Sequence, residues 1–233
     1  MATLSPIIII VLISIAASLF YLLTFRVEWR GLFSTFFLPL AKITPSFITP
    51  NQITFLSFII MLAAGVFIYL AGSAPFLLFW AAVFIALSAV TDAFDGFLAR
   101  ARNASSKRGM FLDYTLDKLG YLSLLFAAML GGLIKTELVV ATMVLSLFYN
   151  IIDLESLLLS KPGPHLTEHS RWVIPAIILC LTGLGTKSFG LEALPVLGIE
   201  FKVLDTVFMV LPAYVLSLGL YRSFCLWKDL KGC

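Results

Sequence analysis

Long apolar stretches separated by short polar breaks dominate this sequence. The first, residues 4–25 (LSPIIIIVLISIAASLFYLLTF), has no charged residue and is long enough to cross the roughly 30 Å hydrocarbon core of a bilayer. Only 12% of the chain is Asp, Glu, Lys or Arg, about half the usual share of a soluble domain. We therefore predict an all-α integral membrane protein. Six further spans are predicted, at about 52–72, 75–100, 110–133, 136–159, 171–187 and 203–225.

The first 50 residues are predicted to form two separate units ahead of the other spans. Residues 1–25 lack the basic start of a secretory signal, so they are expected to stay as an extra N-terminal transmembrane span. In 26–50, apolar residues recur at helical intervals and charges fall between them, which indicates an interfacial amphipathic helix and linker. An ordinary linker is the alternative. Either Thr49 or Asn51 can cap the span that follows.

The basic residues are distributed unevenly across the predicted topology. If the connection at 101–109 is cytoplasmic, thirteen of the sixteen Lys and Arg residues lie on that side and three on the other. Such a bias marks the cytoplasmic face. We expect a multi-pass protein of the cytoplasmic membrane or endoplasmic reticulum, with its N-terminus outside and residues 227–233 as a cytoplasmic tail. No nucleic-acid partner is expected.

Four aspartates interrupt the apolar pattern. Asp92 and Asp95 share one helix face near the end of a predicted span, and Asp113 and Asp117 share a face near the start of the next. A polar connection of about eight residues makes these spans antiparallel neighbours, so the four carboxylates can converge near the cytoplasmic surface. For one aspartate, a cap or a solvated charge is the simpler interpretation, but four on two matched faces favour a site.

Four acids at membrane depth repel one another unless they bind a cation. Hard oxygen ligands without Cys or His suit Mg²⁺ or Mn²⁺, which often bridge to substrate phosphates. Gly96, Ala99 and Gly109 leave the helix surfaces bare beside the acids, so that a flat ligand such as a nucleotide can approach the backbone. Close helix packing is a compatible role for these small residues. Nearby basic residues favour phosphoryl chemistry: Arg100, Arg102, Lys107, Arg108 and Lys118.

This pattern resembles the signature of a known family. The sequence matches the CDP-alcohol phosphotransferases (CDP-alcohol phosphatidyltransferases, class I) at every signature position: Asp92, Asp95, Gly96, Ala99, Arg100, Gly109, Asp113 and Asp117. The resemblance covers about residues 45–226. It implies a six-helix catalytic membrane domain at 51–226, a homodimer, and a polar cavity open to the cytoplasm.

The resemblance also implies a reaction and a role for each residue. A CDP-linked lipid supplies a phosphatidyl-type group, the hydroxyl of a polar alcohol attacks its phosphorus, and CMP leaves. Two Mg²⁺ or Mn²⁺ ions are expected on Asp92, Asp95, Asp113 and Asp117, with Asp117 also the general base. The CDP site is expected to include Asp92, Gly96, Ala99, Arg100, Gly109 and Asp113, together with Asn51 and Thr54, for which helix capping is the alternative role.

The acceptor is predicted to be a phosphorylated polyol such as inositol phosphate or glycerol phosphate. Candidate acceptor-binding residues are Lys118, Asn150, Glu155 and Arg171. The chain has Ile151 and Asp153 where the inositol-phosphate branch usually carries basic residues, so a serine or amino-alcohol acceptor stays open. So does a soluble CDP-polyol donor. Outside this reaction class, a divalent-cation transporter is the alternative, although transporters favour acids at the midplane and internal repeats.

Overall fold

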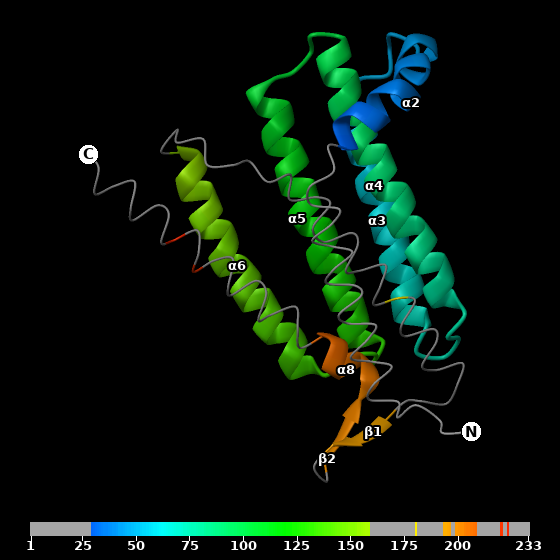
Figure 1. Cartoon of the computed structure of the whole chain (residues 1–233), viewed down its shortest axis with the longest axis vertical. Helices are drawn as coiled ribbons and strands as arrows, with labels where there is room; N and C mark the ends of the chain where they lie inside the picture. Colours follow the sequence, from blue (N-terminus) through cyan, green and yellow to red (C-terminus); the bar gives the residue numbers. More distant parts are fainter. Residues whose placement is uncertain are drawn as a thin grey trace.

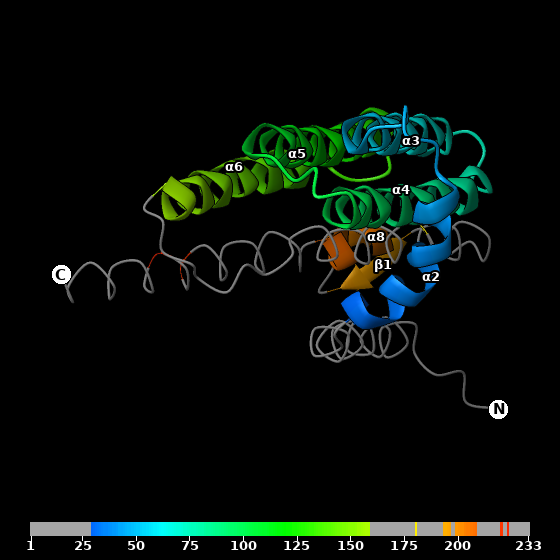
Figure 2. The ribbon, with the colours of Figure 1, turned by 90° about the horizontal axis from the view of Figure 1, so that it is seen from above.

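The computed structural model describes residues 29–158, 193–196 and 199–208, with single positions at 180, 220 and 223. The described chain is built on five helices that follow one another along the sequence: α2 (Trp29–Ile43), α3 (Pro50–Leu70), α4 (Leu77–Ala101), α5 (Lys107–Leu130) and α6 (Thr136–Leu158). From α3 to α6, consecutive helices run in opposite directions (Figure 1). Seen along the bundle, α3, α5 and α6 lie in one row, and α4 packs beside it with α2 on its far side (Figure 2).

Four of the predicted spans are present as helices of 21 to 25 residues. Two of them, α3 and α4, are long and apolar enough to cross a membrane by length and composition. The predicted spans at 4–25 and 171–187 lie outside the described residues, apart from a buried Cys180 in the latter. The span at 203–225 is described at its start, as α8 (Val203–Phe208), and otherwise only at positions 220 and 223.

Side-chain caps define where α3 and α5 begin. The Thr49 hydroxyl accepts a hydrogen bond from the Gln52 amide at 3.4 Å, and the Gln52 side-chain oxygen accepts one from the Thr49 amide at 2.8 Å. This capping box settles the choice between Thr49 and Asn51 in favour of Thr49. At α5, the Ser106 hydroxyl accepts from the Gly109 amide at 3.0 Å. The caps position two turns that carry candidate nucleotide residues.

The connection between α4 and α5 reverses the chain within a few residues. Asn103 has a φ of 52°, in the left-handed region that asparagine tolerates better than most residues. The Ala104 amide donates to the Ala99 carbonyl at 2.8 Å, which closes the end of α4. This tight reversal brings the last turns of α4 beside the first turns of α5.

Small residues allow α3 to pack closely against both neighbours. A Cβ atom on Gly120 of α5 would lie 3.1 Å from Met61 Cγ, so a larger residue there would require the Met61 side chain to shift. Between α3 and α4, the buried hydroxyls of Ser57 and Ser88 lie 3.0 Å apart, and each also donates to the other residue's carbonyl at 3.0 Å. Such polar contacts between small residues are typical of membrane helix pairs.

Helix α2 lies within the segment 26–50 that the sequence predicts to hold an amphipathic helix. Its Phe37 is 1% exposed, with its ring centroid 5.3 Å from that of Phe94 and 6.0 Å from that of Phe97 on α4. On the same helix, Phe36 and Ile43 stay largely exposed, at 67% and 75%. The helix therefore has one apolar side against α4 and further apolar side chains outside the protein core.

A small hairpin is the one departure from the all-helical prediction among the described residues. Strand β1 (Ala193–Val196) pairs antiparallel with β2 (Ile199–Lys202). Four residues per strand are too few for a clear alternating pattern, so the sequence did not indicate them. The hairpin and α8 lie at the end of the bundle opposite the α4–α5 connection (Figure 1). There the fully buried Asp205 accepts from the Lys135 amide at 2.9 Å, directly before α6.

Candidate metal and nucleotide site

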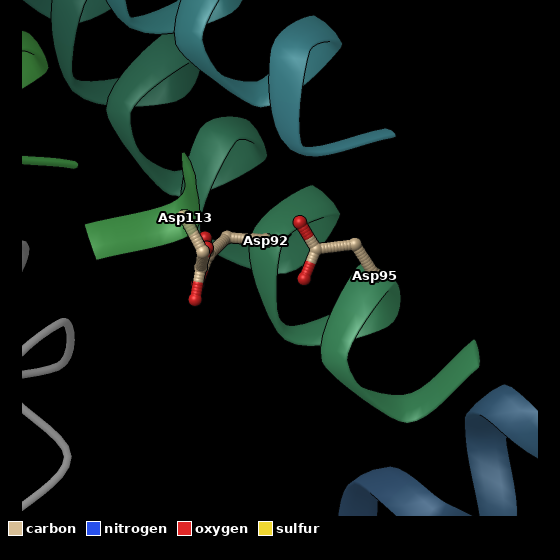
Figure 3. A group of neighbouring side chains, drawn as sticks. All are labelled: Asp92, Asp95 and Asp113. Carbon is tan, nitrogen blue, oxygen red and sulfur yellow. The ribbon is translucent and has the colours of Figure 1, made fainter. Parts of the chain in front are cut away.

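Three of the four predicted carboxylates meet between α4 and α5. One oxygen from each of Asp92, Asp95 and Asp113 lies within 4.8 Å of the others. Asp92 and Asp95 come from successive turns of α4, and Asp113 comes from α5 (Figure 3). This arrangement follows from the i, i+3 spacing on α4 and from the packing of both α4 and α5 on α3, which lets the carboxylates reach toward one another.

The carboxylates are largely withdrawn from solvent. Asp95 is 4% exposed, Asp92 and Asp113 are half-buried, and each has one oxygen fully shielded. Acids gathered in such surroundings repel one another unless a positive charge compensates them. Ligand oxygens around Mg²⁺ lie about 2.0–2.1 Å from the ion, hence up to roughly 4.2 Å apart, and those around larger cations lie further apart. The three oxygens therefore fit a divalent cation with small side-chain adjustments.

Asp117 lies outside this group of three. It is half-buried on α5, four residues after Asp113 and therefore one helical turn further along the same face. The predicted convergence of four carboxylates thus holds for three of them within the 4.8 Å group. Asp117 is therefore placed beside the group rather than in it.

Two predicted nucleotide residues from different helices meet at the start of α3 and α5. A Cβ atom on Gly109 would lie 3.1 Å from Oδ1 of Asn51, so the amide side chain of Asn51 rests against the bare backbone of Gly109. Asn51 is exposed and does not cap its helix, which leaves its side chain free of that role. Thr54, in contrast, is buried and donates its hydroxyl to the Pro50 carbonyl of its own helix at 3.2 Å.

Gly96 leaves the surface of α4 beside the acids without a side chain. Among the described residues, a Cβ atom on Gly96 would meet the guanidinium of Arg100, at 3.4 Å from Nη1 and 3.9 Å from Nη2. Arg100 is exposed at the end of α4, and Ala99 beside it is half-buried. Gly96 and Ala99 therefore add little side-chain bulk beside the acid group, and the Arg100 guanidinium lies over Gly96.

The candidate acceptor residues are only partly described. The Lys118 ammonium lies 5.0 Å from the centroid of the Tyr114 ring on the same helix, within reach of a cation–π contact. Asn150 is half-buried near the C-terminal end of α6. Glu155 lies on α6, but its side chain is outside the described residues, as is Arg171. These four residues stay predictions.

The contacts of two side chains near the site were not predicted from the sequence. Phe37 packs on Phe94, which directly precedes Asp95, and thus contacts the turn of α4 that carries this acid. Arg102 was expected to add positive charge near phosphates, but its guanidinium binds backbone carbonyls ahead of α3. Neither contact has a sequence signal, because each joins residues more than fifty positions apart.

Comparison with known proteins agrees with the signature. A family model for CDP-alcohol phosphatidyltransferases matches residues 47–216. The chain belongs to the CDP-alcohol phosphatidyltransferase family. The predicted resemblance is confirmed, and family membership together with two apolar helices of spanning length identifies a membrane protein.

Relatives of this CDP-alcohol phosphatidyltransferase family member agree with the assignment. The archaetidylinositol phosphate synthase of Pyrococcus horikoshii is 41% identical over 97 residues, which cover 42% of this chain and 49% of that protein, so the match spans about half of the relative's length. The fold is similar to that of the phosphatidylinositol phosphate synthase PgsA1 from Mycobacterium tuberculosis. Its apo structure has a TM-score of 0.56 at 20% identity, covering 77% of this chain and 90% of that one. Its structure with CDP-DAG bound has a TM-score of 0.58 at 19% identity, covering 83% and 92%.

Proposed function

We propose that this protein is a phospholipid-synthesising transferase that moves a phosphatidyl-type group from a CDP-linked lipid to a phosphorylated polyol and releases CMP. The observation that carries the proposal is the group formed by Asp92, Asp95 and Asp113, whose oxygens lie within 4.8 Å of one another at the family's signature spacing. The two similar proteins reported above are an archaetidylinositol phosphate synthase and a phosphatidylinositol phosphate synthase, and the latter has a structure with CDP-DAG bound, so inositol phosphate is the first acceptor to test.

Each residue of the site has a task in this reaction. Asp92, Asp95 and Asp113 would hold Mg²⁺ or Mn²⁺, with two ions expected in the complete site. Bound cations would neutralise the charge on the donor's diphosphate. The missing side chains at Gly96 and Gly109 would let the cytidine nucleotide approach these helices closely, beside Arg100 and Asn51.

The transfer itself forms one bond and breaks one. The acceptor oxygen bonds to the phosphorus that carries the lipid, and the bond from that phosphorus to the oxygen of CMP breaks. An alcohol is a poor nucleophile at neutral pH, so the Asp117 carboxylate would take its proton as the new bond forms. Arg100, exposed beside Gly96, would contribute positive charge to the donor's phosphates.

We propose a multi-pass topology in which this site opens to the cytoplasm. The acid group lies in the half of the bundle that holds the α4–α5 connection and its basic residues, whereas α8 and the hairpin lie at the other end. Exposed Phe36, Ile43 and Phe47 would place α2 at the membrane surface. The retained first span and its outside N-terminus, the six-span domain at 51–226, the cytoplasmic tail and a homodimer complete the proposal.

Two substitutions separate metal binding from proton transfer. Asp117→Asn should abolish turnover while CDP binding in the presence of Mg²⁺ stays close to that of the unmodified protein. Asp92→Asn should weaken metal-dependent CDP binding as well. Calorimetric titration of CDP with and without Mg²⁺, beside a turnover assay, measures both effects. Near-normal turnover in Asp117→Asn would refute its role as the base.

A further inference from the structure

The guanidinium of Arg102 binds the segment that leads into α3. Its Nη1 donates to the Ile48 carbonyl at 2.7 Å, and its Nη2 donates to the carbonyls of Thr44 at 2.6 Å and Pro45 at 3.2 Å. Arginine suits this task because its N–H groups form a rigid planar fork that can engage several acceptors at once. Arg102 is half-buried there, at the C-terminal cap of α4.

The bound segment has few backbone hydrogen bonds of its own: the Thr44 amide donates to the Leu40 carbonyl and the Ile48 amide donates to the Pro45 carbonyl, each at 3.1 Å. Residues 44–48 lie between the end of α2 and the Thr49 cap, in turn and bend conformations. Carbonyls in such a segment need partners from elsewhere or from water. Charge-assisted bonds to an arginine are stronger than neutral ones. Arg102 therefore ties the linker, and through it the start of α3, to the end of α4.

The start of α3 is also where Asn51 meets Gly109. Ile48 is followed directly by the Thr49 cap, and Asn51 lies in the first turn of the helix. Its Oδ1 is 3.1 Å from the position of a Cβ on Gly109, at the start of α5. Three helix ends thus come together: those of α3, α4 and α5. Their relative placement depends on a contact between the end of α4 and the chain before α3.

We propose that Arg102 is a positioning residue for nucleotide binding. By holding the linker at Thr44, Pro45 and Ile48, it sets the first turn of α3 so that Asn51 stays against Gly109. This inference rests on the proposed function, because it assigns Asn51 to the CDP site. Arg102 itself acts through the linker rather than by touching the donor.

The first experiment tests the clamp without any ligand. Hydrogen–deuterium exchange of the full-length protein in detergent is compared for the unmodified chain and for Arg102→Gln. We expect faster exchange in peptides covering residues 44–53 of the variant and unchanged exchange in the middle of α5. Lys42→Gln is the matched control, because it removes one exposed positive charge from the end of α2 and leaves the three carbonyl contacts in place. Unchanged exchange at 44–53 would overturn the proposal.

The second experiment tests the consequence for the site. Calorimetric titration with CDP and Mg²⁺ should show about tenfold weaker binding in Arg102→Gln, equivalent to about 1.4 kcal/mol, and no change in Lys42→Gln. In an Asn51→Ala background, Arg102→Gln should add less than about a twofold further loss, because both changes act through Asn51. Full additivity would show a general structural effect and would overturn the positioning role. Unchanged affinity would do the same.

Two further outcomes keep this inference distinct from the proposed function. If the unmodified protein binds no CDP, the proposed function fails and the nucleotide-positioning role falls with it, whereas the exchange data still decide whether Arg102 holds the linker. If Arg102→Gln is not recovered as folded protein, Arg102→Lys replaces it. Lysine keeps the charge but cannot present a planar fork. In Arg102→Lys we therefore expect smaller increases in exchange at residues 44–53 and a smaller loss of CDP affinity.

Discussion

Substituting Gly96 with alanine should keep or raise the stability of the protein and weaken CDP binding. Gly96 lies inside α4, where alanine is favoured over glycine by about 1 kcal/mol. Among the described residues, the added Cβ would meet Arg100, at 3.4 Å from Nη1, and that flexible end can move. We therefore expect the free energy of unfolding to stay equal or to rise by up to about 1 kcal/mol.

The same methyl group would occupy the face that a nucleotide needs. Overfilling a close-fitting contact costs about 1–3 kcal/mol, and each 1.4 kcal/mol is a factor of ten in affinity. CDP binding should therefore weaken by roughly tenfold to a hundredfold while thermal stability is kept. The assay pairs a thermal-unfolding measurement in detergent with calorimetric titration of CDP in Mg²⁺.

Gly65→Ala is the matched control for this prediction. Gly65 also lies inside a helix, α3, and a Cβ there would make ordinary contacts at 3.7 Å from Ala127 Cβ and from the Ser123 carbonyl. It should change stability in the same direction and leave CDP affinity alone. A stable Gly96→Ala protein with unchanged CDP affinity would refute the assignment of this face to the nucleotide.

Two further predictions concern the packing that supports the site. Phe37→Ala should lower the free energy of unfolding by about 3–5 kcal/mol, because it empties a fully buried position; chemical unfolding measures this loss. The same change should weaken metal-dependent CDP binding, because Phe37 packs on Phe94 directly before Asp95; titration of CDP in Mg²⁺ measures this effect. Ser57→Ala should lower the free energy of unfolding by about 1 kcal/mol, and the double variant Ser57→Ala/Ser88→Ala should lower it by less than the sum of the two single changes, because the hydroxyls bind each other. Additive losses would contradict the shared contact.

Local patterns in the sequence predicted the parts of the structure that depend on neighbouring residues. Apolar run length predicted α3 to α6, and the sequence narrowed the cap ahead of the second span to Thr49 or Asn51, of which Thr49 is the cap. The acid group was predictable for the same reason, since i, i+3 spacing and a short reversal determine which carboxylates can meet. These features need only helix geometry.

Long-range contacts were not predictable from such patterns. Arg102 reaches carbonyls more than fifty residues away, and the positions of those carbonyls depend on how the linker folds. Asp117 lies outside the group of three, which the helical spacing alone did not determine. Asp205 lies at the start of a predicted apolar span, and an acid in such a span indicates that its carboxylate is buried with a hydrogen-bond partner, here the Lys135 amide.

The central claim is tested most directly by CMP release from the purified protein. The assay supplies Mg²⁺ and a CDP-lipid with acyl-ester or isoprenoid-ether tails, and compares inositol phosphate, glycerol phosphate, inositol, serine, ethanolamine and choline as acceptors. The account predicts CMP release that depends on inositol phosphate and disappears in Asp117→Asn. Absence of CMP release with every pair of substrates, from protein that also fails to bind CDP, would contradict it.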